Sequence, residues 1–373
     1  MARKTEPDTL SPAKAQAALK SLRTNIDKLD LQILKLINER ASLAGEIGRI
    51  KSDNGTEVFS PAREEEVFKN VLDASKGPLD EVTIRAIYRE IMSGSRALQK
   101  ILKVAYLGPQ YSYSHLAAIE RFGHKVEYMM VGSISSVFEE VNRGHVDFGV
   151  VPLENSTDGG VSDTLDMFMR LPQLKIGAEV RLKVHHNLLA NCDQEHIRRV
   201  YSKPQALSQC RNWLSKNLPH ADLKDVSSTA VAAQLAKQEP GAAAVASRQA
   251  AVAYGLRILF DNIEDFAHNE TRFAVIGHQE THRTGSDKTA LMFRVPHKPG
   301  SLVDALNVFN SNKLNLTWIE SFPAKTGSQE YMFFVDFEGH ADDPKVKRAL
   351  GLLEEHCDQL FVLGSFPLAT VSE

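Results

Sequence analysis

The stretch that decides the fold of the first part of the chain is LRTNIDKLDLQILKLINERASLAGEIGRIK, residues 22–51. Its apolar residues recur at three- and four-residue steps, which is typical of one face of an amphipathic helix. The pattern predicts a helix of about 30 residues from about Ser21, longer than most globular helices. We expect such a helix to bury its apolar face against other long helices or a second chain.

Two shorter helices are predicted to follow. The pair Ser60-Pro61 fits the N-cap and the first turn of one of them. The other should span about residues 79–102. The first unit is therefore predicted to be all-helical over residues 15–102, after a flexible tail of residues 1–14.

The pattern changes at residue 103. Short apolar runs that end in Gly, Pro or polar residues alternate with helical stretches up to residue 280, which predicts an α/β domain. The turn-rich segment HQETHRTGSDK then indicates a linker. The rest, residues 281–373, has the order βαββαβ of a ferredoxin-like sandwich. The fold class is thus multidomain.

Composition excludes several classes of protein. The formal net charge is −3 over 373 residues, which argues against a nucleic-acid or anionic-membrane partner. No apolar run approaches the roughly 18 residues of a membrane span. The three cysteines form no CxxC pair, so we expect a cytoplasmic protein without disulfides. Nucleotide-binding signatures and metal-ligand spacings are absent, so neither a cofactor nor a metal is expected.

Two cations lie where the apolar stripe of the first helix predicts core residues. Arg40 and Lys51 are eleven positions apart, so they project from one helical face, about 16 Å apart. Ser95 and Gln99 are four positions apart on the third helix. Buried cations are costly unless anions neutralise them, which favours an anion-binding pocket. The alternative is that they pair with internal carboxylates or extend to solvent.

The segment quoted above, with VFSPAREEEV and IYREIMSGSRALQ, resembles the all-helical chorismate mutase family over about residues 18–100. The resemblance implies a clamp for the two carboxylates of chorismate, which rearranges to prephenate without a nucleophile or a proton transfer. It implies that Arg23 and Arg40 hold the carboxylates, and that Lys51 and Gln99 donate to the ether oxygen.

The same resemblance gives the remaining pocket residues. They are Ser60, Arg63, Glu64 and Ser95, with Glu64 at the ring hydroxyl. Arg23 lies about 100° around the helix from Arg40, as expected if it enters the site of a partner subunit. Ser60 stands at a position that is often acidic in the family, so its role as an N-cap could be its only one.

In the α/β part, polar residues stand where predicted strands end, and ligands of open α/β sheets bind at strand ends. No GxSxG elbow is present. The segments GPQYSYSH, VPLENSTDG, YSKPQALSQC and NETRF together resemble prephenate dehydratase over about residues 103–280. This family implies a two-lobed domain like that of periplasmic binding proteins. For Ser112 alone, a turn or helix-cap role is the alternative.

The dehydratase resemblance implies the residues of a second site. Thr271 is the acid that protonates the departing hydroxyl of prephenate, and Phe273 packs on the substrate. Glu154 orients Asn155 or holds backbone amides. The substrate-binding set is Ser112, Ser114, Glu154, Asn155, Ser156, Gln209, Thr271, Arg272 and Phe273.

Two positions depart from that family. Tyr111 replaces a glycine and would be strained if the backbone needs a positive φ. Lys203 replaces a histidine and adds a charge near the site, where it could alter the pH dependence.

The last part, with PGSLVDAL and NLTWIESFP, resembles the ACT regulatory domain over about residues 287–367. Such modules usually pair and bind an amino acid between them. The implied contacts to phenylalanine are Gly300, Ser301, Leu302, Asn315, Glu320 and Ser321. Phe322 replaces an arginine of the family motif, which predicts weaker or different feedback. A module that only dimerises is the alternative.

The combined prediction is a bifunctional enzyme that converts chorismate to prephenate and then to phenylpyruvate, under phenylalanine feedback. We expect a homodimer or a dimer of dimers. One alternative is a dehydratase that prefers arogenate. The other is a non-catalytic amino-acid or anion sensor with decayed catalytic domains.

Overall fold

The computed structural model describes residues 11–54, 57–266, 268–323 and 330–372. The chain divides into two compact units. The first comprises residues 1–58 and 94–100, and the second comprises residues 59–93 and 101–373. Each unit is described by itself.

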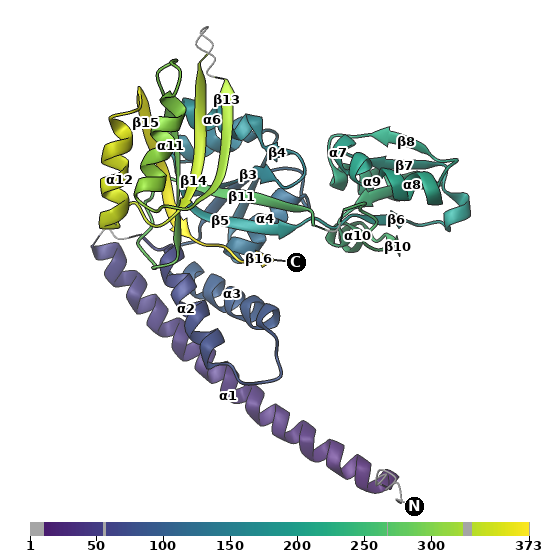
Figure 1. The fold of residues 1–373 in the computed structure, drawn as a ribbon. Helices are drawn as coiled ribbons and strands as arrows, with labels where there is room; N and C mark the ends of the chain where they lie inside the picture. Colours follow the sequence, from purple (N-terminus) through teal and green to yellow (C-terminus); the bar gives the residue numbers. More distant parts are fainter. Residues whose placement is uncertain (1–10, 55–56, 267, 324–329, 373) are drawn as a thin grey trace, which may run out of the picture. The chain divides into compact units, whose positions relative to one another are not determined.

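Helix α1 (Pro12–Asp53) dominates the first unit and has 42 residues (Figure 1). It begins well before the predicted start at Ser21, so residues 12–14 do not belong to a flexible tail. Pro12 occupies the first turn, where its missing N–H costs nothing, and the alanine-rich segment after it has high helix propensity.

The apolar stripe of α1 is largely exposed within the chain. Leu22 is 60% exposed and Leu29 is 56% exposed, whereas Gly48 is buried. The predicted burial of this face against other long helices or a second chain therefore stays a prediction. A continuous exposed apolar face of this length is typical of a surface that binds another protein chain.

The second unit begins with α2 and with the part of α3 that precedes residue 94. Helix α2 (Pro61–Ala74) is capped by Ser60, whose side chain accepts a hydrogen bond from the backbone N–H of Arg63, as the sequence predicts. Helix α3 (Glu81–Ala97) ends earlier than the predicted Leu102. Its last turn tightens, because the backbone N–H groups of residues 99 and 100 both bond to the carbonyl of Arg96.

The α/β part consists of two lobes, and this confirms the predicted class. The sheet of the first lobe has the order β16-β5-β11-β3-β1-β2, with β4 paired to β3. Its strands are β1 (Lys103–Leu107), β2 (Glu127–Val131), β3 (Phe148–Asn155), β4 (Gly159–Gly160), β5 (Lys175–Lys183), β11 (Glu270–Gly277) and β16 (Val371–Ser372). Its helices are α4 (Tyr113–Phe122), α5 (Ile134–Asn142) and α6 (Ser162–Arg170).

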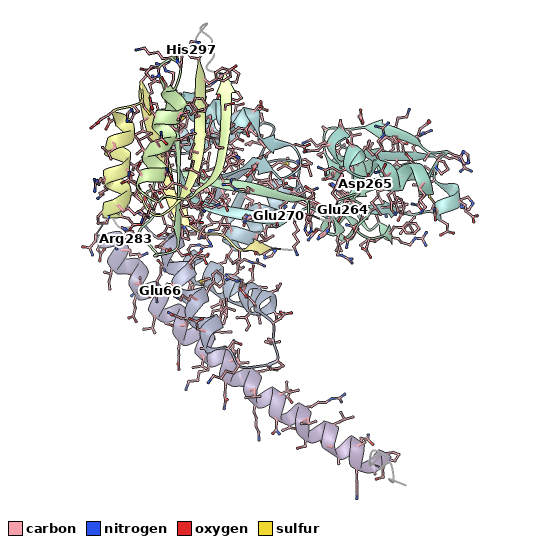
Figure 2. All side chains as sticks on the ribbon, in the orientation of Figure 1. Glu66, Glu264, Asp265, Glu270, Arg283 and His297 are labelled. Carbon is pink, nitrogen blue, oxygen red and sulfur yellow. The ribbon has the colours of Figure 1, made fainter. Side chains whose placement is uncertain are left out.

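The second lobe has its own sheet, of order β10-β6-β9-β7-β8. Its elements are β6 (Asn187–Ala190), η1 (Gln194–His196), β7 (Arg199–Ser202), α7 (Pro204–Gln209), α8 (Arg211–Asn217), β8 (Asp222–Asp225), α9 (Thr229–Gln238), β9 (Ala242–Ala246), α10 (Arg248–Tyr254) and β10 (Arg257–Phe260). The chain crosses between the lobes before β6 and after β10, where Figure 2 labels Glu264 and Asp265.

The C-terminal sandwich has the predicted order βαββαβ. Its elements are β12 (Asp287–Arg294), α11 (Ser301–Ser311), β13 (Leu316–Pro323), β14 (Tyr331–Glu338), α12 (Pro344–Glu354) and β15 (Gln359–Pro367). The sheet order is β13-β14-β12-β15, and both helices cover the same face of this sheet (Figure 1).

The other face of this sheet packs on the first lobe. Met292 and Phe334 of the sandwich share one core with Ile176 and Ala274 of the first lobe. At Gly364 of β15, a Cβ atom would lie 2.2 Å from the carbonyl oxygen of Ile176, so only glycine permits this approach. The chain then returns to the first lobe, because β16 pairs with β5.

Candidate active sites

In the first unit the structure brings Arg40 and Ser95 together. One terminal nitrogen of the Arg40 guanidinium donates to Ser95 Oγ at 3.0 Å. Gln99 packs on α1 at Gly48, where a Cβ would lie 2.4 Å from its Cγ. The Oε1 atom of Gln99 is buried and has no hydrogen-bond partner among the described residues. A buried carbonyl oxygen without a partner is costly, so Gln99 is an exception among the buried polar groups of this unit.

The other predicted residues of this unit lie differently. Lys51 Nζ donates to the carbonyl oxygens of Glu57 at 2.9 Å and Val58 at 3.3 Å, beyond the end of α1. Arg23 is exposed on α1. A groove of about 680 Å³ runs along α1 beside Gln99. It is lined by Asn38, Ala41, Ser42, Gly45, Glu46, Gly48, Arg49, Ser52, Leu98 and Gln99.

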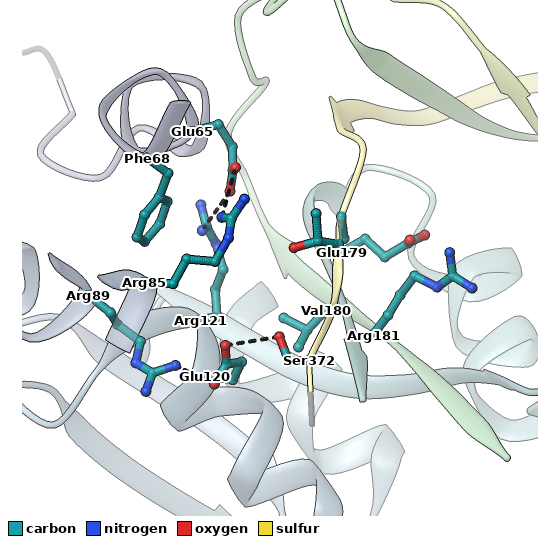
Figure 3. A pocket seen from close by; sticks show the side chains of 12 residues that line it. Glu65, Phe68, Arg85, Arg89, Glu120, Arg121, Glu179, Val180, Arg181 and Ser372 are labelled. Atoms are coloured by element: carbon teal, nitrogen blue, oxygen red, sulfur yellow. Dashed lines mark hydrogen bonds and ion pairs between the residues drawn. The ribbon is translucent and has the colours of Figure 1, made fainter. Parts of the chain in front are cut away.

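Arg63 and Glu64 belong to the second unit, where carboxylate and guanidinium groups pair. Arg63 is 2.6 Å from Glu66, which Figure 2 labels. Glu64 is 3.4 Å from Arg121 of α4. Figure 3 shows the small cavity, of about 60 Å³, that Arg121 and its neighbour Glu65 line. Its other arginines are also paired with carboxylates, at Glu81, Glu120 and Glu270.

At the centre of the α/β part, the amide of Asn155 has a fixed orientation. Its Oδ1 accepts from the backbone N–H of Thr157 at 3.1 Å, and its Nδ2 donates to the carbonyl of Glu270 at 3.3 Å. Backbone groups cannot exchange the roles of donor and acceptor, so they determine which atom is nitrogen.

This orientation determines the role of Thr271. Asn155 and Thr271 are paired across β3 and β11, and Asn155 Nδ2 donates to Thr271 Oγ1 at 2.9 Å. The threonine oxygen is therefore an acceptor in this contact. Its own proton remains available to a further acceptor.

The chain of hydrogen bonds continues into the second lobe. The Thr157 hydroxyl donates to Asn155 Oδ1 and accepts from Gln209 Nε2 at 2.7 Å. Gln209 Oε1 accepts from Asn269 Nδ2 at 2.8 Å and lies 2.8 Å from His186 Nε2. That histidine nitrogen must carry the proton, because an amide oxygen only accepts. Burial lowers the pKa of His186, which favours the neutral form of its ring.

Thr157, Asn269 and His186 were not predicted from the sequence. The first two lie inside the quoted segments VPLENSTDG and NETRF. The segments therefore located the site correctly, but these two residues were not selected as members of it. His186 is buried at the crossing between the lobes, and no local signal separates it from its neighbour His185.

The serines serve mainly structural bonds. Ser112 caps α4 by accepting from the N–H of His115, and it donates to the carbonyl of Leu107, so the cap alternative describes it. Ser156 accepts from the N–H of Glu270 at 2.9 Å and donates to the carbonyl of His268. Ser114 is buried in α4.

Arg272 is enclosed by carboxylates. Its guanidinium donates to Glu154 at 2.8 Å, to Glu179 at 2.7 Å and to Asp336. Glu154 is thus paired with Arg272, and its predicted role in orienting Asn155 or holding backbone amides stays a prediction. Phe273 is 2% exposed in the core of the first lobe, which leaves it no surface to place on a substrate.

Tyr111 precedes α4 of the first lobe, and Lys203 precedes α7 of the second lobe. Tyr111 has a φ of 65°, so it occupies the strained left-handed conformation that the replaced glycine implied. Its ring contacts His115 of α4 and Tyr254 of the second lobe, with centroids 5.7 and 6.2 Å apart. Lys203 is exposed at the N-cap position of α7.

In the C-terminal sandwich, the predicted effector residues lie on two elements. Gly300, with a φ of 88°, is the N-cap of α11, and Ser301 and Leu302 form its first turn. Asn315 donates to Glu338 at 3.1 Å. Glu320 of β13 lies against Gly160, where a Cβ would be 3.2 Å from its Cγ. Ser321 is exposed on β13.

Two further observations concern the part of the chain that the structure describes. No group of three or more His, Cys, Asp or Glu side chains there is placed to hold a metal ion. No helix there combines the length and the apolar character needed to cross a membrane.

Comparison with known proteins gives three successive matches to family models. They are chorismate mutase type II over residues 22–100, prephenate dehydratase over residues 104–281, and the ACT domain over residues 289–351. A protein of Aquifex aeolicus named bifunctional chorismate mutase/prephenate dehydratase is 45% identical over 360 residues, which are 95% of this chain and 99% of that protein.

Solved structures match the second part of the chain. Prephenate dehydratase of Arthrobacter aurescens, in complex with L-Phe, is 32% identical with a TM-score of 0.67, over 72% of this chain and 90% of that one. GqqA, whose structure is described as a novel type of quorum quenching acylase, is 29% identical with a TM-score of 0.64, over 72% of this chain and 98% of that one. The shared fold alone therefore does not decide the reaction.

A helical unit, a two-lobed α/β domain and an ACT sandwich in one chain define a multidomain enzyme with a regulatory module. The full-length relative adds the particular identity. The chain belongs to the bifunctional chorismate mutase/prephenate dehydratase family.

Proposed function

We propose that this chain rearranges chorismate to prephenate in its helical unit and converts prephenate to phenylpyruvate in its two-lobed domain. The observation that carries the second step is the polarity of the hydrogen bond between Asn155 and Thr271, which leaves the threonine proton for the substrate.

In the dehydratase step, the Thr271 hydroxyl donates its proton to the ring hydroxyl of prephenate as the C–O bond breaks. The electron pair of the breaking C–carboxylate bond completes the aromatic ring, and carbon dioxide and water leave. Solvent returns the proton to Thr271. A positioned acid of this kind contributes about 10²–10⁴ in rate. Gln209 orients a substrate carboxylate with the second N–H of its Nε2, and Asn155 and Ser156 join it after releasing the carbonyls of Glu270 and His268.

In the mutase step, the protein only has to hold chorismate in its reactive conformation. Arg40 binds a carboxylate beside Ser95, and the amide of Gln99 donates to the ether oxygen. Lys51 joins it after releasing the carbonyls of Glu57 and Val58.

The second carboxylate is held by Arg23 of another copy of the chain, which makes the active form a homodimer or a dimer of dimers. The exposed apolar stripe of α1 supports this assembly, because Leu22 and Leu29 lie on it and would be buried by a second α1. Ser60, Arg63 and Glu64 complete the mutase pocket.

Phenylalanine is the proposed effector, bound between two paired sandwiches. The ACT match and the relative that was solved with L-Phe support this assignment. The N-terminus of α11 would hold the carboxylate through Gly300, Ser301 and Leu302. Asn315, Glu320 and Ser321 would complete the site. We place these reactions in the cytoplasm, and we expect neither a cofactor nor a metal.

The test is incubation of the purified chain with chorismate, following prephenate and phenylpyruvate with and without phenylalanine. Thr271→Ala should abolish phenylpyruvate formation and leave prephenate formation unchanged. Undiminished phenylpyruvate would refute the assignment of Thr271. Faster turnover of arogenate than of prephenate would instead establish the arogenate alternative, and absence of any turnover would favour the sensor.

A further inference from the structure

A buried carboxylate of the C-terminal sandwich contacts the arginine that follows Thr271. We infer that Asp336 is a positioning residue of the dehydratase reaction, which acts through Arg272 and transmits the state of the sandwich to Thr271. The inference rests on the proposed dehydratase function and names a residue that neither the motifs nor the family resemblance assigned.

The contact is enclosed on all sides. The side chain of Asp336 is 1% exposed and that of Arg272 is 9% exposed. Asp336 lies on the face of β14 that carries Met332 and Phe334 into the core shared with the first lobe. Its Oδ2 accepts from the guanidinium of Arg272, while its Oδ1 is buried and has no partner among the described residues.

The charges around Arg272 do not balance. Glu154, Glu179 and Asp336 face Arg272 and Lys288, whose Nζ is 3.7 Å from Glu179. Three carboxylates thus meet two cations. A neutral residue in place of Asp336 would leave two carboxylates facing two cations, so neither cation would be left without a counter-charge.

The charged cluster lies on the opposite face of β3 and β11 from Asn155 and Thr271. Arg272 follows Thr271 on β11, Glu154 precedes Asn155 on β3, and Arg272 bonds to Glu154 at 2.8 Å. Neighbouring residues of a strand point to opposite faces. The ion pair therefore holds the two strands together directly behind the Asn155–Thr271 hydrogen bond. Regular pairing with β3 is interrupted between Arg272 and residue 273, so the ladder alone does not fix this point.

The sandwich reaches the same arginine through a second side chain. Trp318 of β13 is paired with Asp336 and lies over the Arg272 guanidinium, 5.4 Å from the ring centroid. Two residues further along β13, Glu320 packs on Gly160 of β4, which is paired with Glu154 of β3. A shift of β13 on effector binding would therefore move two contacts that support Asn155 and Thr271, namely the contact of Trp318 with Arg272 and the contact of Glu320 with Gly160.

The experiment compares Asp336→Asn with the wild-type full-length chain. We expect kcat for prephenate to fall by about ten- to a hundredfold, the scale of a misplaced catalytic group, with KM changed much less. Mutase activity should be unchanged. Phenylalanine should still bind in calorimetry, but it should inhibit the residual dehydratase activity less. Asp342→Asn is the matched control, because Asp342 is an exposed, ion-paired carboxylate of the same sandwich.

The outcomes separate the inference from the proposed function. A wild-type chain without dehydratase activity would refute the proposed function. An active wild type with Asp336→Asn equal to it in kcat and in feedback would overturn the inference alone. If Asp336→Asn does not fold, Asp336→Glu decides, because it keeps the charge but displaces the carboxylate. Reduced kcat with unchanged KM in that variant supports the inference, and wild-type kcat overturns it.

Discussion

Replacing Asn155 by aspartate tests the polarity of the hydrogen-bond chain without changing its shape. In the wild type, Asn155 Nδ2 donates to Thr271 at 2.9 Å, to Asn269 at 3.0 Å and to the carbonyl of Glu270 at 3.3 Å. In Asn155→Asp this position becomes an acceptor. The Thr271 proton would then turn to the new carboxylate and away from the substrate.

The expected effects follow from these contacts. The contacts to Asn269 and to the carbonyl of Glu270 are lost, at about 1 kcal/mol each, which costs about 2 kcal/mol of the free energy of unfolding, while the contact to Thr271 reverses its direction. A carboxylate that faces two carbonyl oxygens in a site only 8% exposed adds to this cost. Loss of the positioned acid should lower kcat by about 10²–10⁴, or about 3–5 kcal/mol of activation free energy.

The pH dependence gives the variant a specific signature. Burial and the facing oxygens raise the pKa of the introduced carboxyl group in the folded state above its unfolded value. Protonation therefore favours the folded state, so the stability of the variant relative to wild type rises as pH falls through that folded pKa. The protonated carboxyl can donate to Thr271 again, and part of the dehydratase activity should return.

The assay is phenylpyruvate formation from prephenate across pH, with chemical denaturation at the same pH values. Mutase turnover is the internal control. Thr271→Ser, which keeps the hydroxyl, should retain much of the wild-type kcat. Wild-type kcat in Asn155→Asp at neutral pH, or activity that decreases further on acidification, would refute the proposed polarity.

Three further predictions concern other parts of the chain. Gln99→Ala should raise the mutase activation free energy by up to about 3–4 kcal/mol, and equal rates of prephenate formation would contradict this. Gly364→Ala places a Cβ 2.2 Å from the carbonyl of Ile176 and should destabilise the fold by about 3 kcal/mol or more in thermal unfolding, whereas Gly351→Ala, which meets nothing within 4 Å, should be neutral or slightly stabilising. Phe322→Arg should strengthen phenylalanine inhibition of the dehydratase, and an unchanged inhibition curve would count against the role of Phe322.

Sequence patterns predicted the helices and strands whose formation depends on residues close together in the sequence. The 3.6-residue period gave α1, and the alternation of strands and helices gave the two-lobed domain and the βαββαβ sandwich. The start of α1 was missed because residues 12–20 are rich in alanine and carry little apolar periodicity. The strain at Tyr111 was predicted only for the case that the backbone needs a positive φ there. The family resemblance suggested this case, because it implies a glycine at that position.

The contacts of the site depend on tertiary structure and could not be predicted from local patterns. The carboxylates that enclose Arg272 include Glu179 and Asp336, which are 93 and 64 residues away in the sequence. Family motifs identified Arg272 as important but implied contact with substrate. Likewise, the register of β3 and β11 decides that Asn155 meets Thr271, and no sequence pattern encodes the direction of that hydrogen bond.

The return of the chain to β5 has a practical consequence for proteolysis. Cleavage within residues 278–286, between β11 and β12, would cut the polypeptide into two fragments that remain associated. Residues 371–372 would still pair with β5, and Gly364 would remain pressed against Ile176. The two fragments should therefore elute together in gel filtration and separate only in denaturing electrophoresis. The sandwich would thus stay bound to the first lobe without a covalent connection through residues 278–286.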